Sequence, residues 1–151
     1  MLPADLPKPG NRKRPLRILC ADDDATIGEL MLHFFAEAGH AIEYAEDGLR
    51  AWDRLAKDPG YFDVLITDNQ MPGLSGLGLV ERLRQSEYPG RIVVQSGGLS
   101  SKEAASYRTF GVNLIIPKML PAENLVKVIE SLDWGTPANS ARSWSRPESV
   151  A

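Results

Sequence analysis

Aspartates follow two short apolar runs of this chain, at the positions where buried strands would end. Three consecutive aspartates, residues 22–24, come directly after the apolar run 18–21, and Asp68 comes directly after the run 64–67. The carboxyl ends of parallel strands meet at one edge of a sheet, where open α/β sheets bind their ligands. Carboxylates gathered there repel one another unless a divalent cation or a proton neutralises them. The pattern therefore predicts a Mg²⁺ site.

Two more polar side chains are expected at the same edge. Ser96 follows a fourth apolar run, and Lys118 follows a fifth, just past Pro117. One or two carboxylates of the triplet, Asp68 and a main-chain carbonyl near Gln70 would hold the Mg²⁺. Asp68 would then be a nucleophile that forms an aspartyl phosphate, with Ser96 and Lys118 binding the phosphoryl oxygens. None of these groups is a general base able to activate water strongly, so the set favours phosphoryl capture.

The elements that must position these groups alternate along the chain. Five short, evenly apolar runs predict strands, and segments of helical period lie between and after them. The first helical segment is the clearest, with Leu30 and Phe35 on its apolar stripe and Gly39 placed to end it. The predicted strands are residues 16–21, 42–45, 64–67, 92–95 and 114–116.

Five repeats of a strand followed by a helix imply parallel strands joined by right-handed crossovers. The sequence therefore predicts an α/β fold, a five-stranded parallel doubly wound sheet with helices on both faces. The chain has 151 residues, which is the size of one domain, and 43% of them are hydrophobic. That domain is expected at residues 16–133. Residues 1–15 and 134–151 lack an apolar period, which predicts disordered tails.

Composition narrows the functional classes. A net charge of −3 argues against nucleic-acid binding as the main function, and no apolar run approaches the roughly 18 residues that span a bilayer. The single cysteine, Cys20, excludes an internal disulfide and is expected in the core. His33 and His40 are expected at the surface or at helix ends. We expect a cytoplasmic protein that contacts neither nucleic acid nor membrane.

Five motifs in the expected order resemble the receiver domain of bacterial two-component response regulators. The resemblance covers residues 16–133 and implies the flavodoxin-like form of the fold predicted above. The motifs are the first-strand aspartates, Asp68 with Met71-Pro72, Gly76, Ser96-Gly97 and Lys118.

The resemblance also implies roles for these residues. Asp22 and Asp23 would bind Mg²⁺ together with Asp68. Asp68 would accept a phosphoryl group from a sensor histidine kinase or phosphotransfer protein, and Ser96 and Lys118 would sense it. Such a protein is a phosphorylation-dependent switch rather than an enzyme, with self-catalysed phosphoryl transfer and slow self-dephosphorylation only. Without a second domain in the sequence, we expect a stand-alone regulator whose output is contact with a downstream protein.

The chain departs from the family pattern near its lysine. The family usually has an aromatic residue three positions before the lysine, where this chain has Ile115. Proline usually follows the lysine through a cis bond, whereas here Met119 follows and Pro117 precedes. A short β-branched side chain has few rotamers. We therefore predict that phosphorylation acts chiefly through the loop 97–101 and the start of the fourth helix.

Two other functions are compatible with parts of the sequence. Asp22, Asp24 and Thr26 spell the motif of haloacid dehalogenase-like phosphatases, in which Asp22 would be the nucleophile and Asp24 the acid and base. That hypothesis leaves Asp68 without a role, and the chain lacks that family's later acidic pair and cap domain. The second alternative is a receiver-fold interaction module that works without phosphorylation, suggested by Ile115 and Met119.

Overall fold

The computed structural model describes residues 15–132 and residue 134. Apart from Pro15 and Trp134, the predicted tails lie outside the described residues. Among the residues described, no helix is both long and apolar enough to cross a bilayer.

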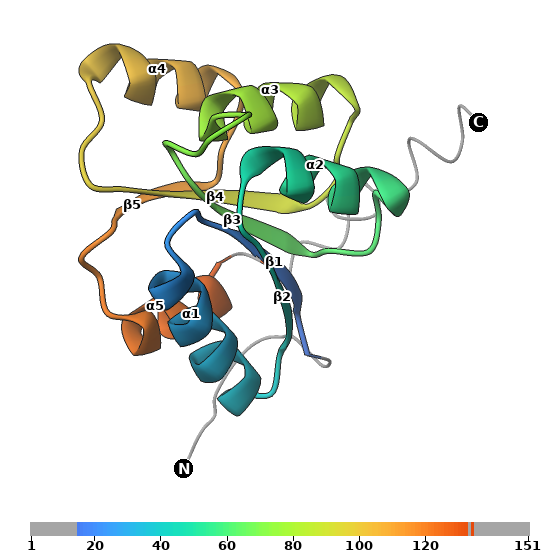
Figure 1. Ribbon diagram of the computed structural model, residues 1–151, viewed down its shortest axis with the longest axis vertical. Coiled ribbons are helices and arrows are strands. Elements are labelled where there is room, and N and C mark those ends of the chain that lie inside the picture. Colours follow the sequence, from blue (N-terminus) through green and yellow to red (C-terminus); the bar gives the residue numbers. More distant parts are fainter. Residues whose placement is uncertain (1–14, 133, 135–151) are drawn as a thin grey trace.

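Five parallel strands form one sheet in the order β2-β1-β3-β4-β5 (Figure 1). Each predicted strand is present, with ends shifted by one residue or less. This confirms the predicted α/β fold. The strands are β1 (Arg17–Ala21), β2 (Ala41–Ala45), β3 (Val64–Asp68), β4 (Arg91–Ser96) and β5 (Leu114–Pro117).

Helices cover both faces of the sheet, as expected. α1 (Ala25–Glu37) and α5 (Ala122–Glu130) lie on one face, opposite the other three helices (Figure 1). Those three are α2 (Gly48–Lys57), α3 (Gly76–Gln85) and α4 (Ser101–Thr109).

Alternation along the strands builds two cores. Ile18 and Cys20 of β1 face the core under α1 and α5, whereas Leu19 and Ala21 face the core under α2, α3 and α4. All five residues of β3 are buried, as a central strand covered on both faces requires. Asp68 is the last of those five. The carboxylate therefore lies at the end of the most enclosed strand.

Side-chain caps fix where four helices begin, at the same edge of the sheet as the aspartates. Asp24 accepts a hydrogen bond from the Thr26 N–H at 2.9 Å and begins α1 immediately after the triplet. Ser100 and Glu103 form a reciprocal capping box at the start of α4. Asp47 and Ser75 cap α2 and α3, because their side-chain oxygens accept from the Arg50 and Gly78 N–H groups. The loops that carry the polar residues are thus short and hydrogen-bonded.

One expectation about a single side chain was wrong, and another was met only in part. His40 lies just past the end of α1, where its backbone N–H donates to the Phe35 carbonyl at 3.0 Å, so it is a helix-end residue as expected. Its side chain is nevertheless buried, because both ring nitrogens have partners: Nδ1 accepts from the Leu16 N–H at 3.0 Å, and Nε2 lies 2.7 Å from a Glu130 carboxylate oxygen. Leu30 is 44% exposed, because only Gly28, Met31 and Phe35 of α1 are buried. His33 is exposed, as predicted.

Trp134 was assigned to the C-terminal tail, yet it packs against the domain. Its Nε1–H donates to the Ile129 carbonyl at 3.0 Å, and the Arg91 guanidinium lies 5.0 Å from the centre of its ring. The ring also contacts the core under α1 and α5. The packed domain therefore reaches at least Trp134.

Candidate functional site: an acidic cluster at the sheet edge

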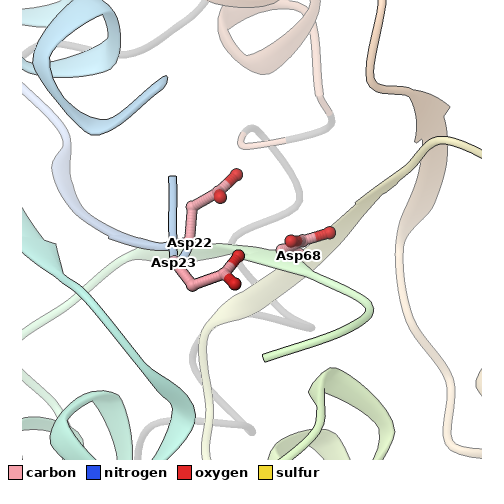
Figure 2. A group of neighbouring side chains, drawn as sticks. All are labelled: Asp22, Asp23 and Asp68. Carbon is pink, nitrogen blue, oxygen red and sulfur yellow. The ribbon is translucent and has the colours of Figure 1, made fainter. Parts of the chain in front are cut away.

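The carboxylates of Asp22, Asp23 and Asp68 converge at the point where the strand order reverses. β1 and β3 are neighbours in the sheet, yet their crossovers run in opposite directions, which opens a crevice at their carboxyl ends. One carboxylate oxygen from each aspartate lies within 4.8 Å of the others. Figure 2 shows the three side chains extending into one space from the ends of β1 and β3. The spacing suits ligands of one hard cation.

Lys118 brings a positive charge to this cluster from the turn after β5. Its Nζ lies 3.0 Å from Asp68 Oδ2 and 3.2 Å from Asp22 Oδ2. The Lys118 N–H also donates to the Ser96 carbonyl at 3.0 Å, which fixes the turn to the end of β4. Burial acts to lower the pKa of the ammonium, but its hydrogen bonds to Asp68 and Asp22 outweigh burial and raise that pKa. Lys118 is therefore a fixed cation.

Asp22 is the most buried of the three carboxylates, at 1% exposure. Its Oδ1 accepts from the Asp24 N–H at 2.9 Å. Its Oδ2 is near Lys118 but has no hydrogen-bond partner among the described residues. Burial raises the pKa of Asp22, and the charge of Asp68 adds to the rise. A buried carboxylate oxygen without a hydrogen bond fits a divalent cation, which would supply the missing partner.

Asp68 is buried and held at both oxygens. The Asn69 N–H donates to Oδ1 at 2.7 Å, and Lys118 Nζ donates to Oδ2 at 3.0 Å. The carboxylate is thus oriented into the crevice by one backbone group and one side chain.

Ser96 and Gln70 are less closely tied to the cluster. Ser96 ends β4, directly beside β3, and its hydroxyl oxygen accepts from the Gly98 N–H at 3.1 Å. Among the described residues no hydrogen bond joins it to Asp68. Gln70 is exposed in the loop after β3. The roles predicted for the Ser96 hydroxyl and the Gln70 carbonyl stay predictions.

The turn after β5 contains no cis peptide bond, nor does any other described segment. The Leu120 N–H donates to the Pro117 carbonyl at 3.2 Å, which closes the turn around Lys118 and Met119. The Met119 side chain is 86% exposed. Ile115 is half-buried and packs against the core under α2, α3 and α4. The lysine thus reaches the cluster through a turn built without the usual proline.

Four residues around the site were not predicted from the sequence. The Tyr44 hydroxyl of β2 donates to the Asp22 carbonyl at 2.6 Å. The Tyr107 hydroxyl of α4 donates to the Asn69 side-chain oxygen, whose amide group lies 3.4 Å from a Glu103 oxygen. Asn69 carried a visible signal, because it is a polar residue beside Asp68. Nothing in the sequence pairs it with a tyrosine 38 positions away.

A pH dependence follows from the buried Asp22. Since its folded-state pKa is raised above 3.8, the folded protein binds more protons than the unfolded protein between those two pKa values. Its contribution to stability therefore falls as pH rises through that window. We expect the free energy of unfolding of wild type, relative to Asp22→Asn, to fall in EDTA as the pH rises from the ordinary pKa of an aspartate toward the raised pKa of Asp22.

Urea unfolding of both proteins at several pH values measures this difference. Titrating groups far from residue 22 contribute equally to the free energy of unfolding of the two proteins, so their contributions cancel. Repeating the series in Mg²⁺ is the control, because a bound cation should favour wild type at neutral pH. A difference that rose with pH in EDTA would contradict the assignment to Asp22.

Comparison with known proteins agrees with this geometry. Residues 18–130 match the family described as response regulator receiver domain. Response regulator MprA of Mycobacterium leprae is 31% identical over 117 residues, which cover 78% of this chain and 50% of that protein. The chain thus spans about half the length of this relative. Chemotaxis protein CheY4 of Vibrio cholerae is 28% identical with a TM-score of 0.71, covering 78% of this chain and 98% of that one.

A response regulator receiver protein from Pseudomonas putida is 26% identical with a TM-score of 0.70, covering 80% of this chain and 98% of that one. Receiver domains are signalling switches rather than classical enzymes. They bind a divalent metal through an acidic cluster, and response regulators interact with histidine kinases or phosphotransfer proteins. The family match contains β2 to β5, all of β1 except Arg17, and the whole acidic cluster, and the chain belongs to the response regulator receiver domain family.

Proposed function

We propose that this receiver domain is switched by phosphorylation of Asp68. One observation carries the proposal: Asp68 ends the central strand within 4.8 Å of the Asp22 and Asp23 carboxylates, with the Lys118 ammonium 3.0 Å away. A carboxylate oriented in this way can act as a nucleophile, and the cluster around it is suited to phosphoryl oxygens.

In the proposed step an Asp68 carboxylate oxygen attacks the phosphorus of a phosphorylated histidine. The new bond is between that oxygen and phosphorus, and the bond between phosphorus and the imidazole nitrogen breaks. The imidazole leaves with the electron pair and takes up a proton from solvent. The product is an acyl phosphate, which carries about 1.5 to 2 negative charges in place of the single charge of the Asp68 carboxylate. The domain catalyses its own modification and, slowly, its own dephosphorylation.

Mg²⁺ is the proposed metal, held by the carboxylates of Asp22, Asp23 and Asp68 and by the Gln70 main-chain carbonyl. Three carboxylates and one carbonyl are the oxygen ligands that this ion prefers, and the unpaired Asp22 oxygen supports the fit. When bound, the ion would neutralise charge on the transferring phosphoryl group.

Lys118 and Ser96 are the proposed sensors of the phosphoryl group. Lys118 already bridges two carboxylates, so a short movement of its ammonium would bring it to a phosphoryl oxygen. Ser96 stands at the end of the adjacent strand, and its hydroxyl is free to donate while its oxygen accepts from Gly98. Movement of both groups would shift the turn after β5 and the loop after β4 toward the crevice.

The proposed donor is a sensor histidine kinase or phosphotransfer protein in the cytoplasm, and the proposed output is contact with a downstream protein. The exposed Met119 side chain beside the crevice adds an apolar group to the surface that either partner would meet.

Acetyl phosphate tests the proposal without a known kinase. We expect wild type to gain one phosphoryl mass in acetyl phosphate and Mg²⁺, and none when EDTA replaces Mg²⁺. Intact-protein mass spectrometry measures the phosphoryl mass in both conditions. Replacing Mg²⁺ by Ca²⁺ is a control for the requirement for octahedral geometry, because Ca²⁺ accepts looser geometry than Mg²⁺. A protein that binds Mg²⁺ yet gains no phosphoryl group would instead be a phosphorylation-independent module.

A further inference from the structure

α4 buries a single side chain in the domain, that of Tyr107. Tyr107 is the only residue of this nine-residue helix that is buried, and it is fully buried. The other eight positions of the helix are exposed or half-buried. An element with so little buried apolar surface is among the easiest to displace. What Tyr107 contacts therefore decides how α4 is held.

The Tyr107 hydroxyl donates to the side-chain oxygen of Asn69, the residue next to Asp68. Burial raises the pKa of Tyr107, so the phenol stays protonated and remains a donor. The Asn69 amide group lies 3.4 Å from a carboxylate oxygen of Glu103, one turn earlier on α4. Two residues of α4 thus hold one side chain.

The backbone of Asn69 connects this contact to Asp68 and to α3. Its N–H donates to Asp68 Oδ1 at 2.7 Å, and its carbonyl accepts from the Gly76 N–H at 2.8 Å at the start of α3. Little free space surrounds this contact, because a Cβ added at Gly76 would lie 2.9 Å from the Tyr107 oxygen and 3.0 Å from the Asn69 Cα. A movement of Asn69 therefore either shifts Asp68 or breaks the hydrogen bond between Asn69 and Tyr107.

We propose that Tyr107 is a positioning residue for Asp68, acting through Asn69, and that this link couples the position of α4 to the phosphorylation of Asp68. The inference rests on the proposed function, because it assumes that Asp68 receives the phosphoryl group. The hydrogen bond between Tyr107 and Asn69 would be a second connection from Asp68 to α4, in addition to the loop 97–101 after β4. The aromatic group of the switch then lies on α4, while β5 carries Ile115.

The coupling has a direction that follows from the hydrogen bonds. Phosphorylation converts one Asp68 oxygen into the bridging oxygen of a mixed anhydride, which is a poorer acceptor than a carboxylate oxygen, and introduces phosphoryl oxygens that attract the Asn69 N–H. A shift of the Asn69 backbone toward those oxygens draws its side chain from Tyr107. Coupling between sites is reciprocal, so a partner that fixes α4 would change phosphorylation at Asp68 by the same factor at equilibrium.

Tyr107→Phe removes the hydroxyl and keeps the ring, and Tyr88→Phe is a matched control. Tyr88 is also buried, and its hydroxyl donates to the Phe62 carbonyl at 3.0 Å, far from the cluster in the fold. We expect Tyr107→Phe to raise the affinity for beryllofluoride with Mg²⁺ by about 2- to 10-fold, because it removes one hydrogen bond that favours the unmodified state. Tyr88→Phe should leave that affinity at the wild-type value.

Amide chemical shifts give a readout that a purely structural role would not move. In wild type, beryllofluoride should shift the amides of Lys118 and of residues 101–109. In Tyr107→Phe the Lys118 shift should persist while the shifts over 101–109 shrink. Asn69→Ala keeps the backbone donor and removes the side chain, so it should reproduce the effect. A variant that combines Asn69→Ala and Tyr107→Phe should bind beryllofluoride with the same affinity as each single variant, because both substitutions remove the same hydrogen bond.

The outcomes separate the two hypotheses. If wild type binds no beryllofluoride and gains no phosphoryl group, the proposed function fails and the coupling fails with it. If wild type responds but Tyr107→Phe matches Tyr88→Phe in affinity and in shifts over 101–109, the coupling alone is overturned. Additive effects of Asn69→Ala and Tyr107→Phe would overturn it as well. Should Tyr107→Phe fold poorly, Asn69→Ala alone decides by the same two measurements.

Discussion

Asp68→Asn will gain no phosphoryl group under conditions in which wild type is fully modified by acetyl phosphate and Mg²⁺. The substitution is nearly isosteric, and the new side-chain oxygen can still accept from the Asn69 N–H, so the fold should be kept. What is lost is the carboxylate nucleophile. Intact-protein mass spectrometry measures the gain. Borohydride trapping followed by peptide mapping locates the acyl phosphate in wild type.

Asp24→Asn is the matched control for this prediction. Asp24 caps α1 by accepting from the Thr26 N–H, and asparagine is an equally good cap, so phosphorylation should continue. The phosphatase hypothesis predicts the reverse, because there Asp22 is the nucleophile and Asp24 the acid and base. A phosphoryl group that remained in Asp68→Asn, or that mapped to Asp22, would refute the assignment.

The backbone architecture could be predicted because it depends on local pattern. Short apolar runs and helical stripes identified all five strands, and the alternation of strand and helix determined parallel pairing. The convergence of Asp22, Asp23 and Asp68 followed from that topology, since residues at strand ends meet at one edge. The acidic cluster is therefore a consequence of where the apolar runs stop.

The contacts that surround the cluster could not be predicted in the same way. The partners of His40 come from Leu16 and Glu130, which are 24 and 90 positions away. A periodic pattern shows which face of an element is buried, but not which polar group on a distant element completes a hydrogen bond. The sequence therefore indicated a surface or helix-end position for His40 but not the burial of its ring, which is possible because both ring nitrogens have hydrogen-bond partners in the interior.

Tyr107 illustrates the same limit at the functional site. Its ring is buried in the core under α2, α3 and α4, as an aromatic side chain on the inner face of a helix should be. The pattern treats tyrosine as a hydrophobic residue and gives no information about its hydroxyl, which a buried tyrosine must pair. Its partner, Asn69, lies beside the proposed phosphoacceptor. The departure at Ile115 was visible in the sequence, whereas the tyrosine on α4 became significant only in three dimensions.

Gly76→Ala will destabilise the domain by about 1 to 3 kcal/mol, the range for added volume in a packed interior. The new Cβ would lie 2.2 Å from the Asp68 carbonyl oxygen and 3.0 Å from the Asn69 Cα. Both neighbours are backbone atoms of the segment that carries the proposed phosphoacceptor, so no rotation of a side chain can relieve the contact. Either α3 must move away or the end of β3 must shift.

Gly98→Ala is the control, because a Cβ at that position meets no atom within 4 Å and the backbone φ lies outside the left-handed region. Its free energy of unfolding should stay within about 0.5 kcal/mol of wild type. Urea unfolding compares the three proteins, and equal midpoints for the two variants would contradict the clash.

The Gly76 N–H also donates to the Asn69 carbonyl, so displacement of α3 would move Asn69. Gly76→Ala should therefore slow phosphorylation by acetyl phosphate even below the temperature at which it unfolds, whereas a loss of stability alone would leave the rate of the folded fraction unchanged.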